Sequence, residues 1–218
     1  MKKIFFLIIV ICLILPFNVY GKELIDGALS GILIDAESGK IIYKKNIDER
    51  LAVASMTKMV GQIIIMEEIE KGNISWDDIV VVSKNAADMG GSQIYIGQGE
   101  KISIRDLMKG ISMASGNDAT VMMAEVIAGS EEKFVEMMNN KVKELGLKNT
   151  KFVNSTGLDV DGHYSSSYDM AMIARELVIN HPGILEFSSL YEDYLRKNTS
   201  NEFWLVNTNK VVCKWYVL

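Results

Sequence analysis

The sequence predicts a single α+β domain in which a mainly helical lobe follows an opening β-hairpin and one long helix. Two β-rich runs, 29–35 and 40–44, flank a short turn that ends in glycine, the pattern of an antiparallel hairpin. Residues 53–71 place apolar side chains at helical spacing, and a glycine follows them. Further helical patterns lie in tandem between residues 103 and 145. Because no repeat or low-complexity linker separates these segments, we expect one domain.

The other elements follow from capping and turn residues. The run Ile79–Val82 is rich in β-branched side chains and predicts a short strand. Ser103 and Asp106 have the spacing of a capping box and open a helix that reaches Met113. Polar residues precede the later helices, and glycine or proline follows them. These helices are expected at 117–128, 131–145 and 168–180.

Composition narrows the classes of protein to which the chain can belong. Of its 218 residues, 49% are hydrophobic and 23% are charged, which suffices for a buried core and excludes disorder as the default. The 23 Lys and Arg against 28 Asp and Glu give a formal net charge of −5, and no basic cluster follows the first residues. A nucleic-acid partner is not expected, because surfaces that bind nucleic acids hold phosphates with clustered basic side chains.

Residues 1–21 have the features of a secretory signal peptide. Two lysines precede an unbroken apolar run from Ile4 to Leu15, and the segment ends in Gly21. This run of 12 residues is too short for a membrane span, which needs about 20. We expect cleavage after Gly21 and export of an acidic domain to the cell envelope, outside the cytoplasm.

Ser55 and Lys58 form the first candidate catalytic pair. They lie three residues apart at the start of the long helix, where free N–H groups and the helix dipole create a positive field. A serine hydroxyl becomes a nucleophile when a base accepts its proton, and an amine can do so when burial or positive potential lowers its pKa. An N-cap is the alternative role for Ser55. Ser130 and Lys133 have the same spacing, but an N-cap and a solvated lysine explain that pattern.

Ser115 and Asn117 form a second candidate element, in a tight turn between two expected helices. Their hydroxyl and carboxamide are suited to relaying a proton and to holding a substrate amide. The similar run Ser83 to Asn85 follows a strand instead. A serine and a lysine at a helix start, followed by Ser-x-Asn in a helical lobe, is the arrangement found in penicillin-binding proteins and class A β-lactamases.

From about Gly31 to Lys210 the chain resembles the low-molecular-mass penicillin-binding proteins of the D-alanyl-D-alanine carboxypeptidase family. The resemblance rests on motifs that follow one another in order and are together highly specific. These motifs are Ala54 to Lys58, Gly91 to Gln93, Met113 to Ala119, Asn154 to Leu158, His163 to Ala171 and Asn207 to Lys210.

This resemblance implies a β-lactamase/transpeptidase-like fold, an antiparallel sheet with an inserted helical lobe. It also implies that Ser55 is the acylated nucleophile, that Lys58 activates it, and that Ser115 and Asn117 form the second active-site element. The backbone N–H of Ser55 would supply half of an oxyanion hole. The implied substrate is a peptidoglycan stem peptide ending in D-Ala-D-Ala, β-lactam antibiotics would acylate the same serine, and no cofactor or metal is expected.

The family pattern breaks near the end of the chain. The third family motif, Lys-Thr-Gly on a strand that lines the site, does not occur, and residues 211–218 do not resemble the family. We therefore interpret 22–210 as an incomplete carboxypeptidase domain and 211–218 as a divergent tail, with the C-terminal sheet strands and the membrane-binding C-terminal helix missing. We expect the missing strand to be encoded downstream in another reading frame, and turnover without it to be slow.

Alternatives to a working carboxypeptidase stay open. A catalytically impaired fragment would at most bind cell-wall peptide or penicillin weakly. A β-lactamase would need a second base; Glu136 and Asn140 have a suggestive spacing but fall inside an expected helix. His163 could suggest a serine–histidine triad, but we expect a structural role for it in an exposed loop, because the lysine already supplies a base.

Overall fold

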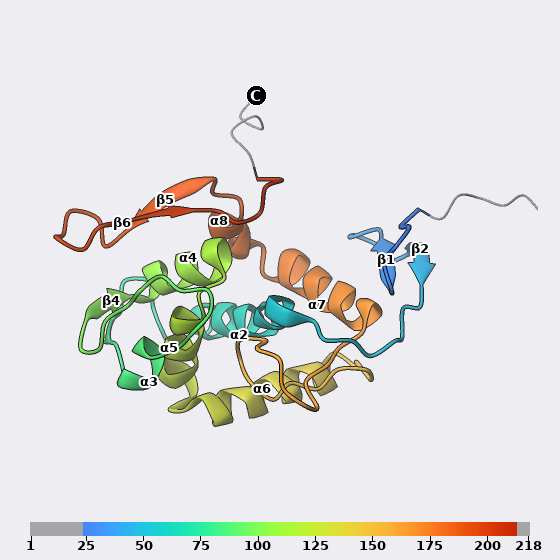
Figure 1. Ribbon diagram of the computed structural model, residues 1–218, viewed down its shortest axis with the longest axis horizontal. Helices are drawn as coiled ribbons and strands as arrows, with labels where there is room; N and C mark the ends of the chain where they lie inside the picture. The colour runs from blue at the N-terminus through green and yellow to red at the C-terminus, as the bar shows by residue number, and fades with distance from the viewer. Residues whose placement is uncertain (1–23, 213–218) are drawn as a thin grey trace, which may run out of the picture.

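The computed structural model describes residues 24–212 and confirms the α+β fold class (Figure 1). The expected signal peptide, residues 1–21, and most of the expected tail, 211–218, lie outside the described residues. Within residues 24–212, none of the helices is long and apolar enough to cross a membrane.

Within the same range the strands form three separate antiparallel pairs. The strands are β1 (Gly31–Ile34), β2 (Ile41–Lys45), β3 (Ile79–Val81), β4 (Lys101–Ser103), β5 (Glu192–Leu195) and β6 (Phe203–Val206). The pairing of β1 with β2 confirms the expected opening hairpin, and the expected strand at 79–82 is β3. The strand β4 and the hairpin of β5 and β6 were not anticipated from the sequence.

The helices agree with the expected ones to within a few residues. The longer helices are α2 (Lys58–Glu70), α4 (Ile104–Ala114), α5 (Asn117–Ala128), α6 (Glu131–Glu144) and α7 (Ser167–Asn180). The short ones are the 3-10 helices η1 (Ala54–Thr57) and η2 (Pro182–Ile184) and the single turns α3 (Lys84–Ala87) and α8 (Leu185–Ser188). Ser103 caps α4 by accepting a hydrogen bond from the backbone N–H of Asp106, as the capping pattern predicts.

The long helix expected over 53–71 begins later than predicted. Residues 54–57 form the 3-10 turn η1, and the regular helix α2 starts at Lys58. Ala54 has a φ of 46°, a left-handed conformation that no right-handed helix contains, so regular helix can start only beyond it. Ser55 consequently lies in the tight turn that leads into α2 rather than in the helix itself.

The central helix α2 carries the core, and α5, α6 and α7 pack around it (Figure 1). Such a helix must be apolar on several faces. The buried residues Val60, Ile63, Ile65 and Met66 meet that requirement. From α6, the fully buried ring of Phe134 lies against α2 beside Gly61.

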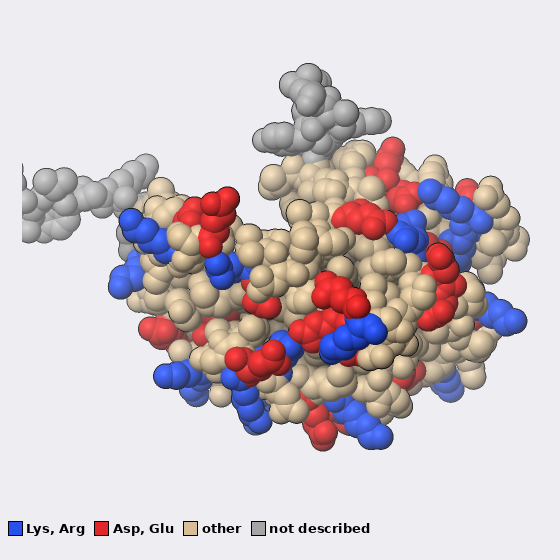
Figure 2. All heavy atoms as spheres, turned by 180° about the vertical axis from the view of Figure 1, so that it is seen from behind, with Lys and Arg blue, Asp and Glu red and all other residues tan. Residues whose placement is uncertain are grey.

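Charged side chains cover the outside of this helical lobe. Lys141 of α6 lies 2.6 Å from Glu67 of α2 and 2.8 Å from Glu144, so ion pairs join the two helices at their exposed edge. On the face shown in Figure 2, acidic and basic side chains are intermingled. The Lys141–Glu67 pair is partly buried, with the lysine side chain 11% exposed, and adds to the contact between the two helices, but the apolar contacts of α2 are the main source of stability.

Replacing Phe134 by alanine tests the role of the contact between α6 and α2. Because the ring is 1% exposed, Phe134→Ala should lower the free energy of unfolding by about 3–5 kcal/mol. The matched control is Ile42→Ala in β2, where the side chain is 63% exposed and the expected change is within about 0.5 kcal/mol. Urea unfolding followed by circular dichroism measures both; equal effects would contradict this description of the core.

Candidate active site

The turn that leads into α2 presents Ser55 to solvent and buries Lys58. Ser55 is exposed, whereas Lys58, three residues later, is only 3% exposed. The left-handed backbone at Ala54 produces this arrangement, because it turns the chain sharply just before the serine. A hydroxyl at the surface is therefore backed by an amine that water hardly reaches.

The amine of Lys58 makes two hydrogen bonds. Its Nζ lies 3.1 Å from Ser55 Oγ and donates to the backbone oxygen of Thr156 at 2.8 Å. Burial disfavours the charged ammonium and lowers the pKa of Lys58 to about 8. A useful fraction of this lysine is thus neutral near pH 7, with its lone pair available to the serine proton.

Gly157 brings the segment that carries Thr156 against the turn. It has a φ of 83°, and a Cβ at this position would lie 1.9 Å from the backbone oxygen of Ala54. Only glycine permits both this backbone conformation and this approach. Thr156 and Gly157 belong to a family motif in the sequence, but no role was expected for them, because such a close approach leaves no local sequence signal other than glycine itself.

His163 stabilises the same turn through a hydrogen bond to Thr57. The backbone N–H of Val153 donates to its Nδ1 at 3.2 Å, so the proton of the neutral ring lies on Nε2, which lies 2.8 Å from Thr57 Oγ1. Burial lowers the pKa of this imidazole, which favours the neutral form. The expectation of an exposed loop was wrong, because His163 is only 7% exposed. Its hydrogen bonds agree with the structural role expected for it.

Ser115 and Asn117 lie where α4 meets α5. Ser115 ends α4 with a φ of 57°, and its Oγ is buried without a hydrogen-bond partner within residues 24–212. Asn117 begins α5 and is 4% exposed; its Nδ2 donates to the backbone oxygen of Gly90 at 2.8 Å. Its backbone N–H donates to the oxygen of Ser92 at 2.7 Å. The left-handed backbone at Ser115 thus ends α4 and lets α5 begin two residues later at Asn117.

A pocket of about 330 Å³ brings Ser55 and Asn117 together. Its walls come from four parts of the chain, since it is lined by residues 52, 54–55, 91–92, 117 and 156–159. Of the four predicted site residues, Ser55 and Asn117 line this pocket, and Lys58 reaches Ser55 from the buried side. Ser115 lies two residues before Asn117 and does not line the pocket. Glu136 and Asn140 stay inside α6 and do not line it either.

The two similar sequence patterns are helix caps. Ser130 accepts a hydrogen bond from the backbone N–H of Lys133 and caps α6 as expected. Ser83 accepts from the N–H of Ala86 and caps α3, a short helix that the sequence analysis did not anticipate. Within residues 24–212, no group of three or more His, Cys, Asp or Glu side chains could hold a metal ion.

A surface serine backed by a buried lysine, with Ser-Gly-Asn at the junction of two helices, defines a fold and site of the penicillin-binding-protein class. A sequence profile of the peptidase S11 family, described as D-alanyl-D-alanine carboxypeptidase, matches residues 23–217, and the chain belongs to this family. The matched range passes Lys210, where the sequence analysis ended the resemblance.

Individual relatives agree with this membership. The chain is 54% identical over 195 residues to the D-alanyl-D-alanine carboxypeptidase DacF of Bacillus subtilis, and the aligned region covers 89% of this chain and 50% of that protein. Penicillin binding protein 6B from Escherichia coli superposes with a TM-score of 0.81 at 33% identity, over 93% of this chain and 63% of the other. Ampicillin-bound penicillin-binding protein D2 from Listeria monocytogenes superposes with a TM-score of 0.74 at 28% identity, over 86% and 74%. The chain spans about half the length of the curated relatives it matches.

Replacing Gly157 by alanine tests the close approach of this residue to the turn. The new methyl group would overlap the backbone oxygen of Ala54, so Gly157→Ala should lower the free energy of unfolding by about 3 kcal/mol or more. Gly162→Ala is the matched control, since Gly162 also has a positive φ, of 84°, but its nearest neighbour is 3.9 Å away. The control should cost about 1–2 kcal/mol, the backbone penalty alone. Equal losses in thermal unfolding would contradict the contact.

Proposed function

We propose that this chain is the peptidase part of a serine-type D-Ala-D-Ala carboxypeptidase that acts through an acyl-enzyme on Ser55. The observation that carries the proposal is the 3.1 Å contact between Lys58 Nζ and Ser55 Oγ in a site that also lowers the pKa of the lysine to about 8. Membership of the S11 family supports the substrate class, a peptidoglycan stem peptide that ends in D-Ala-D-Ala. The signal-like segment supports export to the cell envelope.

The first half of the reaction transfers the peptide to the serine. Neutral Lys58 accepts the proton of Ser55 Oγ, and the oxygen attacks the carbonyl carbon of the penultimate D-alanine. The amide bond to the terminal D-alanine breaks, and the leaving nitrogen takes up the proton. The backbone N–H of Ser55 donates to the developing oxyanion. Water then hydrolyses the ester and restores the free serine.

Ser115 and Asn117 form the second element of the proposed site. The carboxamide of Asn117 lines the pocket and holds the peptide backbone of the substrate. The buried Oγ of Ser115, which lacks a partner within residues 24–212, relays the proton toward the leaving nitrogen.

The same serine is proposed to react with β-lactam antibiotics. A β-lactam amide is attacked like the peptide amide, and the Listeria relative that shares this fold is described in an ampicillin-bound form. A β-lactamase function has less support, because rapid deacylation needs a second base and neither Glu136 nor Asn140 lines the pocket.

Covalent labelling with a fluorescent penicillin tests the proposed nucleophile and base. Ser55→Ala should abolish labelling, and Lys58→Ala should lower the acylation rate at least about 10³-fold, because the two side chains act as one unit. Ser130→Ala and Lys133→Ala are the matched controls, which should label normally; the first loses a helix cap worth about 1 kcal/mol. A fluorescent band that persists in Ser55→Ala would refute the assignment.

The pH dependence of acylation tests the role of Lys58 as the base. With a pKa of about 8, about a tenth of the lysine is neutral at pH 7 and about nine-tenths at pH 9. The acylation rate constant should therefore rise about tenfold between pH 7 and pH 9 and level off above that. Stopped-flow or gel-based labelling across this range gives the profile. A constant rate from pH 7 to pH 9, or one that falls, would exclude a neutral Lys58 as the base.

A further inference from the structure

The segment from Gly90 to Glu100 is neither a helix nor a strand, and it contributes Gly91 and Ser92 to the pocket. Ile94 and Ile96 within it are 0% and 3% exposed, so their backbone polar groups lie away from water. Buried N–H and C=O groups need hydrogen-bond partners, and no neighbouring strand pairs with residues 94–96. Side chains must provide these partners.

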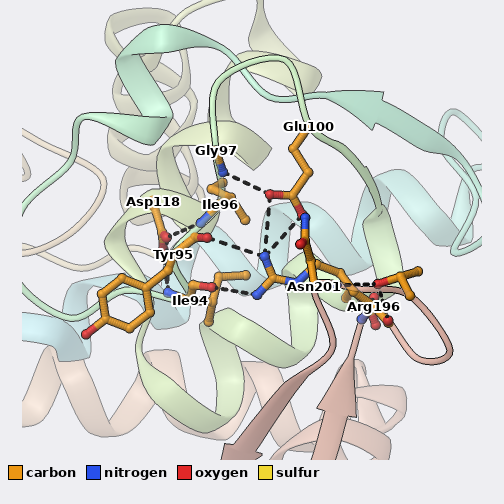
Figure 3. A network of polar contacts seen from close by, with 10 residues as sticks. Ile94, Tyr95, Ile96, Gly97, Glu100, Asp118, Arg196 and Asn201 are labelled. Carbon is orange, nitrogen blue, oxygen red and sulfur yellow. Dashed lines mark hydrogen bonds and ion pairs between the residues drawn. The ribbon is translucent and has the colours of Figure 1, made fainter.

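Asp118 binds the N–H side of this segment. The backbone N–H of Ile94 lies 3.1 and 3.0 Å from its two carboxylate oxygens, and the N–H of Ile96 lies 3.3 Å from Oδ2 (Figure 3). Asp118 is 1% exposed and directly follows Asn117 in α5. The carboxylate that holds the segment thus belongs to the same helix start as the pocket-lining carboxamide.

Arg196 binds the C=O side. Its Nη2 donates to the oxygen of Ile94 at 3.0 Å, and its Nη1 donates to the oxygen of Tyr95 at 3.3 Å (Figure 3). Nη1 also lies 3.1 Å from Glu100, and the side chain of Arg196 is only 9% exposed. The guanidinium plane lies over the ring of Phe203, with its carbon 5.7 Å from the ring centre. Arg196 follows β5 in a left-handed conformation, so the β5–β6 hairpin delivers it to this place.

The held segment continues directly into the pocket wall. Gly91 and Ser92 line the pocket, and the backbone oxygens of Gly90 and Ser92 accept both hydrogen bonds of Asn117. Only Gln93 separates Ser92 from Ile94, so a shift of the segment at Ile94 is passed on to the acceptors that orient Asn117. The position of the pocket wall depends on what holds residues 94–96.

We propose that Asp118 and Arg196 are positioning residues of this site and clamp residues 94–96 from opposite sides. The carboxylate fixes the N–H groups, the guanidinium fixes the C=O groups, and the pocket wall and Asn117 take their geometry from the segment held between them. Loss of the guanidinium leaves two carbonyls without donors and Glu100, 16% exposed, without its cation. Ile94 and Ile96 belong to the same hydrophobic core as α2, so the fraction of folded protein is measured separately from the geometry of the wall.

The first experiment measures the acylation rate constant of Arg196→Met with a fluorescent penicillin, and its relevance to catalysis rests on the proposed function. We expect a decrease of about ten- to a hundredfold, since a misplacement of about 1 Å at such a site costs up to about 10²-fold. Arg196→Lys keeps the charge near Glu100 but cannot reach both carbonyls, so it should give an intermediate rate. The rate constant is normalised to the fraction of protein that labels at completion, which separates the geometry of the site from loss of folded protein.

The matched control is Arg105→Met. Arg105 also pairs with a glutamate, Glu186, and lies over the rings of Trp76 and Phe187. Unlike Arg196, its guanidinium donates to Glu186 and not to the carbonyls of residues 94–95. Its acylation rate constant should stay within about twofold of the unsubstituted chain. A rate constant for Arg196→Met within twofold of the unsubstituted chain would overturn the proposal, as would an equal decrease for both variants.

Amide hydrogen exchange gives a readout that needs no activity. In Arg196→Met the N–H groups of Ile94, Ile96 and Asn117 should exchange at least about tenfold faster, while those of α6 keep their protection. If the unsubstituted chain takes no label, the proposed function fails and exchange alone decides the clamp. Unchanged protection of Ile94 and Asn117 in Arg196→Met and in Asp118→Asn would overturn the clamp whatever the labelling result.

Discussion

The burial of the Lys58 amine next to the hydroxyl of Ser55 is the constraint on which the site depends. A lysine surrounded by water stays protonated at neutral pH and cannot act as a base. The side chain of Lys58 is shielded from water by the rest of α2 and by the Thr156–Gly157 segment. Burial of a lysine destabilises the fold at pH 7, since the amine must lose either its proton or its solvation. The apolar contacts of α2, which begins at Lys58, offset that cost.

Backbone strain lies at both elements of the site. Ala54 and Ser115, neither of which is glycine, have φ values of 46° and 57°. Such conformations cost about 1–3 kcal/mol each and persist where surrounding contacts enforce them. Gly157 and His163 enforce the first turn, and the segment held by Asp118 packs against the helix start that follows the second. The pocket forms where these turns come together, and contacts between distant segments maintain their backbone conformations.

The sequence predicted most helices and the proximity of Ser55 to Lys58 because their signals are local. Capping serines, terminal glycines and helical periodicity lie within a few residues of one another, and so do Ser55 and Lys58. The exceptions depend on distant contacts. The short strand β4 and the β5–β6 hairpin are defined by pairing rather than by pattern, and the burial of His163 follows from a hydrogen bond to Thr57 across 106 residues. The role of Arg196 was equally invisible, since its carbonyl partners lie about a hundred residues earlier.

The long-range hydrogen bonds of the Ser55 turn also set the order in which the molecule can become reactive. The partner of Lys58 is 98 residues away, and the strand-like bridge between Leu51 and Ser165 closes a still longer loop. Closure of such loops is entropically costly and comes late in folding. A growing chain that has left the ribosome only as far as residue 150 already contains Ser55 and Lys58 but not the Thr156 oxygen to which Lys58 donates. Under the proposed mechanism, the serine therefore gains its buried base only after the chain has extended through the segment that contains Thr156 and Ser165.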